Sequence, residues 1–210
     1  MFDDKDQRPE LNNAPIDEEL DAVLKHAELL HAESAAEDEN DESFALNAGS
    51  RRDERILAFC MLYAADRSDY TTDLDDILEM FVKNYDIKIS PESFAYSLAK
   101  GAIETRDEIE EEIKPYLKNW KLERLGCCTR LVLRIAFWEF HQPDAIPSVI
   151  INEAIELTKL FAEFDAYRFV NGILDEYCKQ KGLVEINEET NEETEKKSEA
   201  QEDVEVKKDE

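Results

Sequence analysis

The sequence contains little glycine and little histidine. Only five of its 210 residues are Gly, and no Asn-Gly or Asp-Gly pair stands between two alternating apolar patterns, so the usual signals for β-hairpins are missing. It has three His and lacks the strings G-x-S-x-G, G-x-x-x-x-G-K and G-x-G-x-x-G, which removes support for a nucleophilic triad or a phosphate-binding loop. We therefore predict that the chain is not an enzyme and has no catalytic residues.

Metal and cofactor sites are also poorly supported. Glu28 and His31 match one half of a di-iron site on a helical bundle. Such a site needs a second Glu-x-x-His pair and two further carboxylates from facing helices, and the sequence holds only this one pair. We predict neither a metal nor a cofactor.

Long apolar runs are missing as well. The apolar stretches 131–133 and 135–138 are interrupted by Arg134 and Glu139, far short of the ~20 residues that span a bilayer. The first residues, MFDDKDQRPE, lack the basic and apolar regions of a secretory signal. We expect no membrane segment and a cytoplasmic protein.

The cysteines form no recognisable framework. The sequence has four of them and no C-x-x-C spacing; they are Cys60, Cys127, Cys128 and Cys178. This usage is typical of free thiols in a reducing compartment, and we expect most of them to be small core residues.

Acidic residues are abundant but unevenly placed. The 52 Asp and Glu against 25 Lys and Arg give a formal charge of −27, to which residues 1–50 contribute −12 and residues 183–210 contribute −8. Between these ends lies a segment of the usual size for one domain. We predict an acidic N-terminal extension at 1–49 with one short helix near 16–31, a domain at 50–182, and a disordered acidic tail at 183–210.

The central segment repeats apolar residues at helical spacing. From Leu74 to Tyr85 they form a single stripe, Ser50 is a plausible N-cap, and Asp165 and Gly182 bracket the last helix. We predict an all-α fold, a compact helical bundle, with helices near 51–66, 73–85, 91–113, 121–140, 148–161 and 166–180. The expected buried residues are Leu78, Phe94, Leu98, Leu133, Ile135, Ala154, Val170 and Leu174, with Trp138 on the central helix.

Two further expectations concern packing. Gly172 lies inside an apolar helical pattern, where glycine costs about 1 kcal/mol relative to alanine, so we predict a close helix crossing there. Glu153 and Glu156 are one turn apart, and we expect them to pair with Arg130 or Arg134.

Three stretches in the same order resemble one family. VIINEAIELTKLFAEFDAYRFVNGILDEY at 149–177 and NWKLERLGCCTRLVLRIAFWEF at 119–140 are similar to the C-terminal half of the NusB family of bacterial transcription antitermination factors. RRDERILAFCMLYAADR, from residue 51, resembles that family's basic N-terminal arm running into a Leu-Tyr helix. Together they cover essentially all of the predicted domain.

The resemblance implies two small helical subbundles at an angle and a non-catalytic protein. It implies binding of the boxA element in ribosomal RNA leader transcripts, together with the small-subunit ribosomal protein NusE, within the transcription elongation complex. Whether the chain also forms a homodimer stays open. By the family pattern, the RNA-binding residues are Arg51, Arg52, Arg55, Asp165, Arg168 and Phe169, with the last three expected near the arm. The partner-binding residues are Tyr63, Thr129 and Arg130.

The sequence departs from the family pattern in two places. Asp53 and Glu54 separate the arginines of the arm, which leaves a local charge of only +1 over residues 51–55. Thr129 stands where the family usually has an acidic residue. An alternative reading is therefore an interaction module of the same fold with weak or no RNA binding.

Overall fold

The computed structural model describes residues 49–85, 87–118 and 120–183. This part of the chain is helical throughout, without strands, so the all-α prediction is confirmed. The expected helix near 16–31, the candidate pair Glu28 and His31, and the two acidic extensions lie outside the described residues, apart from Gly49 at one end and Leu183 at the other.

The first half of the domain consists of three helices. They are α2 (Arg51–Arg67), α3 (Leu74–Tyr85) and α4 (Phe94–Glu104). Ser50 caps α2 as predicted, because its Oγ accepts a hydrogen bond from the backbone N–H of Asp53 at 3.1 Å. Every residue of α2 from Ile56 to Leu62 is buried, since α3, α4, α6 and α7 all pack against it.

The second half begins with a short helix. Its α-helices are α5 (Arg106–Ile113), α6 (Cys127–Phe140), α7 (Pro147–Phe161) and α8 (Ala166–Lys181), with 3-10 turns η1 (Lys114–Leu117) and η2 (Leu122–Arg124) between α5 and α6. Pro147 occupies the first position of α7, where its missing N–H costs nothing. Gly182 ends α8 in the left-handed conformation with φ of 65°.

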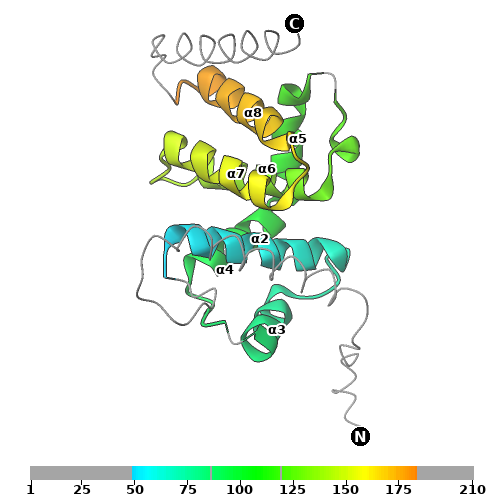
Figure 1. Cartoon of the computed structure of the whole chain (residues 1–210), viewed down its shortest axis with the longest axis vertical. Helices are drawn as coiled ribbons and strands as arrows, with labels where there is room; N and C mark the ends of the chain where they lie inside the picture. Colours follow the sequence, from blue (N-terminus) through cyan, green and yellow to red (C-terminus); the bar gives the residue numbers. More distant parts are fainter. Residues whose placement is uncertain (1–48, 86, 119, 184–210) are drawn as a thin grey trace, which may run out of the picture.

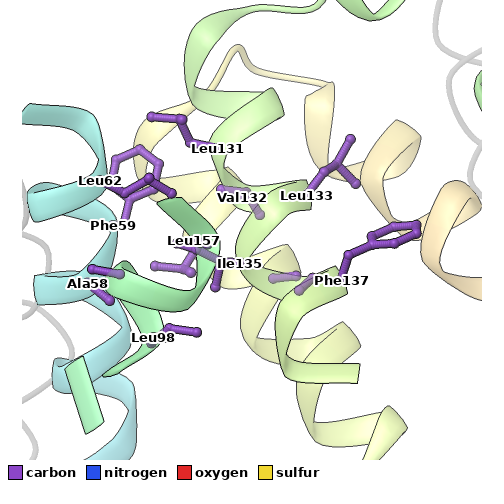
Figure 2. Close-up of a cluster of buried hydrophobic side chains, with 14 of the residues drawn as sticks. Ala58, Phe59, Leu62, Leu98, Leu131, Val132, Leu133, Ile135, Phe137 and Leu157 are labelled. Carbon is purple, nitrogen blue, oxygen red and sulfur yellow. The ribbon is translucent and has the colours of Figure 1, made fainter. Parts of the chain in front are cut away.

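Helix α6 joins the two halves. Figure 1 shows α2, α3 and α4 in one half of the molecule and α5, α7 and α8 in the other, and α6 packs against α2 and α4 as well as α5, α7 and α8. In Figure 2 side chains of α2 such as Phe59 and Leu62 face α6, while Leu133 and Phe137 point away from α2. Phe137 lies 4.6 Å from the Tyr177 ring of α8, centroid to centroid. The core is therefore continuous across the two subbundles.

The predicted helix 91–113 is wrong in its extent. The chain forms two helices, and α4 starts at Phe94, capped by Ser93. The break falls at Thr105, whose hydroxyl donates a 2.7 Å hydrogen bond to the Gly101 carbonyl. Such a back-bonded Thr competes with the helical hydrogen bonds and bends the helix. Likewise, 121–140 contains η2 before α6 begins at Cys127.

One residue expected in the core is only half-buried. Seven of the eight predicted core residues are buried, but Phe94 is not, because it is the first residue of α4 and lies beneath two guanidinium groups. Trp138 packs against the core from the side and remains partly exposed. The Phe94 prediction failed because apolar periodicity does not show how far an element is covered.

The close helix crossing occurs at a different glycine from the predicted one. A β-carbon on Gly172 would meet nothing within 4 Å, so that expectation is wrong. A β-carbon on Gly101 of α4 would lie 1.9 Å from Nε1 of Trp138 on α6. Gly101 therefore permits the contact between α4 and α6.

Candidate nucleic-acid interface

Two exposed arginines stand at the start of α2. The side chains of Arg51 and Arg52 are 68% and 51% exposed. Arg51 pairs with Glu54 at 3.0 Å, and Arg52 pairs with Glu153 of α7 at 3.0 Å. Exposed ion pairs of this kind contribute about 0–1 kcal/mol, so an incoming phosphate can replace the carboxylate partner at small cost.

The two acids that interrupt the arm are turned inward. Asp53 is buried, and the Glu54 side chain is only 14% exposed. Glu54 accepts a 3.0 Å hydrogen bond from the backbone N–H of Phe94 and thereby caps α4. The outer surface of the arm is consequently more cationic than its local charge of +1 suggests.

Arg55 is a buried member of the arm. Its guanidinium forms a bidentate pair with Glu139 of α6, with Nη2 to Oε2 at 2.6 Å and Nε to Oε1 at 2.9 Å. Both side chains are less than 10% exposed. Burial acts to lower the pKa of Arg55, but the hydrogen bonds and charge of Glu139 outweigh it and the pKa is raised. The expected exposed cation is thus a fixed structural link between α2 and α6.

A pocket opens beside these arginines. It has a volume of about 140 Å³ and is bounded by the arm, by Phe94, and by the connection from α6 into α7. Cζ of Arg51 lies 4.3 Å from the centroid of the Phe94 ring, and Cζ of Arg55 lies 5.4 Å from it. Sequence reasoning missed Phe94 as a site residue because its place in an apolar stripe assigned it to the core.

The three residues expected at the start of α8 lie away from the arm. Helices α2 and α7 run side by side in the same direction, since Arg52 meets Glu153 and, further along, the rings of Phe59 and Phe161 stack at 4.2 Å. Helix α8 begins just beyond Phe161, and Figure 1 shows this start at the opposite end of α7 from the start of α2. Arg52 contacts Glu153, and α7 ends eight residues later at Phe161, so the start of α8 lies about 12 Å or more further along the α7 axis.

The start of α8 nevertheless carries its own aromatic and cationic groups. The Phe169 ring packs edge-on against Trp120 with centroids 6.1 Å apart, and Trp120 is 57% exposed. Arg168 is exposed and lies 3.9 Å from Asp165, which precedes α8 but makes no side-chain cap. Trp120 is a neighbour that sequence reasoning did not single out.

Of the expected partner-binding residues, Arg130 contacts an unpredicted carboxylate, that of Asp66. Arg130 donates to both Asp66 oxygens at 3.4 Å, and the Cys127 thiol donates at 3.2 Å. Tyr63 lies one turn earlier on α2 and is partly buried against the core. Thr129 is buried, and its hydroxyl donates a 3.4 Å hydrogen bond to Glu163.

The groups around Asp66 shift the pKa of its carboxyl group. Burial acts to raise the pKa of this carboxyl, but hydrogen bonds from Tyr70 and Cys127 and the charges of Arg130 and Arg134 outweigh it and lower the pKa. The Cys127 thiol is partly buried and lies beside a carboxylate, and both effects raise its pKa, to about 12. A thiol with that pKa is almost fully protonated at neutral pH and is a poor nucleophile.

The acids of α7 do not pair with α6 as predicted. Glu153 pairs with Arg52 and Glu156 with Lys159. Arg134 instead contacts Glu110 of α5, Tyr70 and Asp66. The prediction was wrong because the arginines of α6 face α2 and α5, whereas Glu153 faces the start of α2.

The described part of the chain offers little for other chemistry. Within residues 49–85, 87–118 and 120–183, no cluster of three or more His, Cys, Asp and Glu is placed to hold a metal ion. In the same residues no helix combines the length and apolar character needed to cross a membrane. All four cysteines are free; Cys60 and Cys178 are buried, and Cys127 and Cys128 are partly buried.

Fold and site together define a class of protein: a two-part helical domain with a cationic helix start and an aromatic pocket beside it. The sequence pattern of the NusB family matches residues 52–179. The chain belongs to the NusB family.

Curated relatives agree with this assignment. The chain is 34% identical to the transcription antitermination protein NusB of Macrococcus caseolyticus over 134 residues, which cover 63% of this chain and 98% of the relative. It is 33% identical to the protein of that name from a Nitratiruptor species, over 62% of this chain and 93% of the relative.

Solved structures show the same fold. The NusB structure of T. maritima superimposes with a TM-score of 0.54 at 34% identity, covering 62% of this chain and 91% of that one. A structure of the antitermination factors NusB and NusE in complex with double-stranded RNA matches with a TM-score of 0.53 at 25% identity, over 62% and 96% of the two chains.

Proposed function

We propose that this protein is a non-catalytic transcription antitermination factor that binds the boxA RNA of ribosomal RNA leaders together with NusE. Membership of the NusB family and the similarity to a complex of NusB, NusE and RNA support the proposal. Its site of action is the elongation complex in the cytoplasm.

The observation that carries the proposal is the pair of exposed arginines, Arg51 and Arg52, beside the half-buried Phe94 ring. Arginines supply phosphate contacts, and aromatic rings hold unpaired bases, which is how proteins commonly bind single-stranded RNA. Arg55 supports this arrangement by fixing α2 to α6 and does not itself reach the RNA.

Phe169 and Arg168 form a second RNA contact at the start of α8. The distance between this contact and the arm requires an extended strand that follows the side of α7. Replacing Phe169 by Ala is expected to remove a stacked base, at a cost of about 1–3 kcal/mol in binding with little change in salt dependence. A loss of folding stability with intact RNA affinity would instead assign Phe169 to the core.

The NusE protein is expected to bind at the face around Asp66, where Tyr63 and Arg130 are partly exposed. One nitrogen of Arg130, Nε, is buried and has no hydrogen-bond partner among the described residues.

The test is binding of boxA RNA by anisotropy, with and without NusE, at two salt concentrations. The double variant Arg51→Ala, Arg52→Ala should weaken binding and reduce the salt slope by up to ~0.7 per lost phosphate contact. Lys83→Ala with Lys179→Ala removes the same charge from exposed residues on α3 and α8 and serves as the control.

The alternative function is an interaction module that binds NusE with little RNA affinity. It is favoured by the internal pairing of Arg52 with Glu153 and of Arg55 with Glu139. Intact NusE binding, together with RNA affinity that neither double variant changes, would select this alternative.

A further inference from the structure

The pocket beside Phe94 has the composition of a binding site for one planar, polar-edged group. We propose that it receives a single unpaired base of the bound RNA, stacked on the layer formed by Phe94 and Arg51. The inference rests on the proposed function and adds to it a base-selective subsite within the boxA contact.

The stacking layer is already assembled. The Arg51 guanidinium lies over the Phe94 ring, and the backbone N–H of Phe94 donates a hydrogen bond to Glu54. The guanidinium of Arg55 is fixed by its ion pair with Glu139. Unpaired bases stack on aromatic rings and on guanidinium planes. Arg51 has an exposed side chain, so it can lie on a base while the ring beneath it stays in place.

The size of the pocket limits what enters it. Its volume of about 140 Å³ is close to the ~150 Å³ of an apolar cavity that admits one benzene molecule. One base fits. Its sugar and phosphate remain outside the pocket, near Arg52, which follows Arg51 on α2. Ile146 and Val149, which are 58% and 43% exposed, supply the apolar wall opposite the arm.

The polar edge of the pocket gives it a preference among bases. Gln142 and Asp144 line it from the connection between α6 and α7. A carboxylate only accepts hydrogen bonds, so it pairs with the amino group of adenine, cytosine or guanine. Uracil has one donor on this edge, N3–H, between two carbonyl oxygens that repel a carboxylate, so it is disfavoured.

The experiment uses the full chain with NusE and a labelled single-stranded boxA RNA, alongside RNAs that carry one abasic site at each position in turn. We expect one abasic position to weaken binding between about 5-fold and 100-fold, the equivalent of about 1–3 kcal/mol for one stacked base. Phe94→Ala should weaken binding of intact RNA by the same factor, and the two losses should not add.

Phe94→Leu controls for a folding defect, because it keeps apolar volume at the start of α4 but removes the aromatic face. This variant should show most of the affinity loss of Phe94→Ala, with an unchanged melting temperature. Asp144→Asn should shift the base preference at the coupled position towards uracil. Phe164→Ala, which changes an aromatic residue 93% exposed at the other end of α7, is the control and should not couple to that position.

The outcomes separate the two claims. Suppose that wild-type protein binds boxA RNA through Arg51 and Arg52, but that the loss of affinity caused by each abasic site adds fully to the loss caused by Phe94→Ala. The base pocket is then wrong and the proposed function stands. If wild-type protein binds no boxA RNA with or without NusE, both are overturned.

Discussion

At the scale of single residues, the arm contains exposed and buried arginines, which the sequence alone does not distinguish. Arg52 lies at the surface with Glu153, whereas Arg55 is enclosed with Glu139. We expect Glu139→Gln to lower the free energy of unfolding by about 3–5 kcal/mol, because it leaves a buried guanidinium uncompensated. Glu153→Gln is the matched control and should cost no more than about 1 kcal/mol. Denaturant unfolding measures both; equal, small losses would mean that the Arg55 pair is solvated.

Asp66 is a second residue whose surroundings decide its behaviour. Its lowered pKa means that the folded protein binds the proton less tightly than the unfolded chain does. Its charge therefore contributes stability at neutral pH that is lost as the pH falls below the unfolded value of about 3.9 towards the folded one.

The corresponding measurement compares wild type with Asp66→Asn across pH. The stability gap should be constant between pH values near neutrality and ~5, and should narrow at lower pH as Asp66 becomes protonated in the wild type. A gap that does not change with pH would show that the Asp66 charge has no favourable partners in the fold.

At the scale of helices, the contact between α4 and α6 depends on a glycine. Gly101→Ala places a methyl group against the Trp138 ring, so we expect a loss of about 1–3 kcal/mol from overpacking. Gly172→Ala is exposed on α8 with open space around it and should instead stabilise the protein by up to about 1 kcal/mol through helix propensity. Thermal unfolding that shows the same sign for both substitutions would contradict this crossing.

Periodicity located these helices well but not their contacts. The ranges predicted for α2, α3, α7 and α8 agree with the structure within one residue at each end, because caps and apolar stripes are local signals. The break at Thr105 was missed, since a hydroxyl bonded back to the carbonyl of Gly101 leaves no mark in the apolar pattern.

At the scale of the whole molecule, the charge is concentrated outside the domain. Residues 1–50 and 183–210 carry −12 and −8 of the total −27, and the first of these segments leads directly into the arm. As a hypothesis, the acidic extensions compete with RNA for Arg51 and Arg52. A chain of residues 50–182 should then bind boxA RNA more tightly than the full chain at low salt.

Salt provides the control for that prediction. The difference between the two chains should close as the Debye length falls from ~10 Å at 0.1 M to ~3 Å at 1 M. Equal affinities at low salt would leave the extensions with a solubilising role only.

The amino-acid sequence by itself determined the helical class, the ends of α2, α3, α7 and α8, the family and the arginines at residues 51 and 52, because each depends on residues close together in the chain. Only the tertiary structure decided that Arg55 is buried, that Phe94 lies at a pocket, and that α8 starts beyond the end of α7 that is distant from the arm. Those features depend on which faces meet across α2, α6 and α7. A side chain's exposure and charge partner are set by neighbours distant in sequence, and a local pattern carries no record of them.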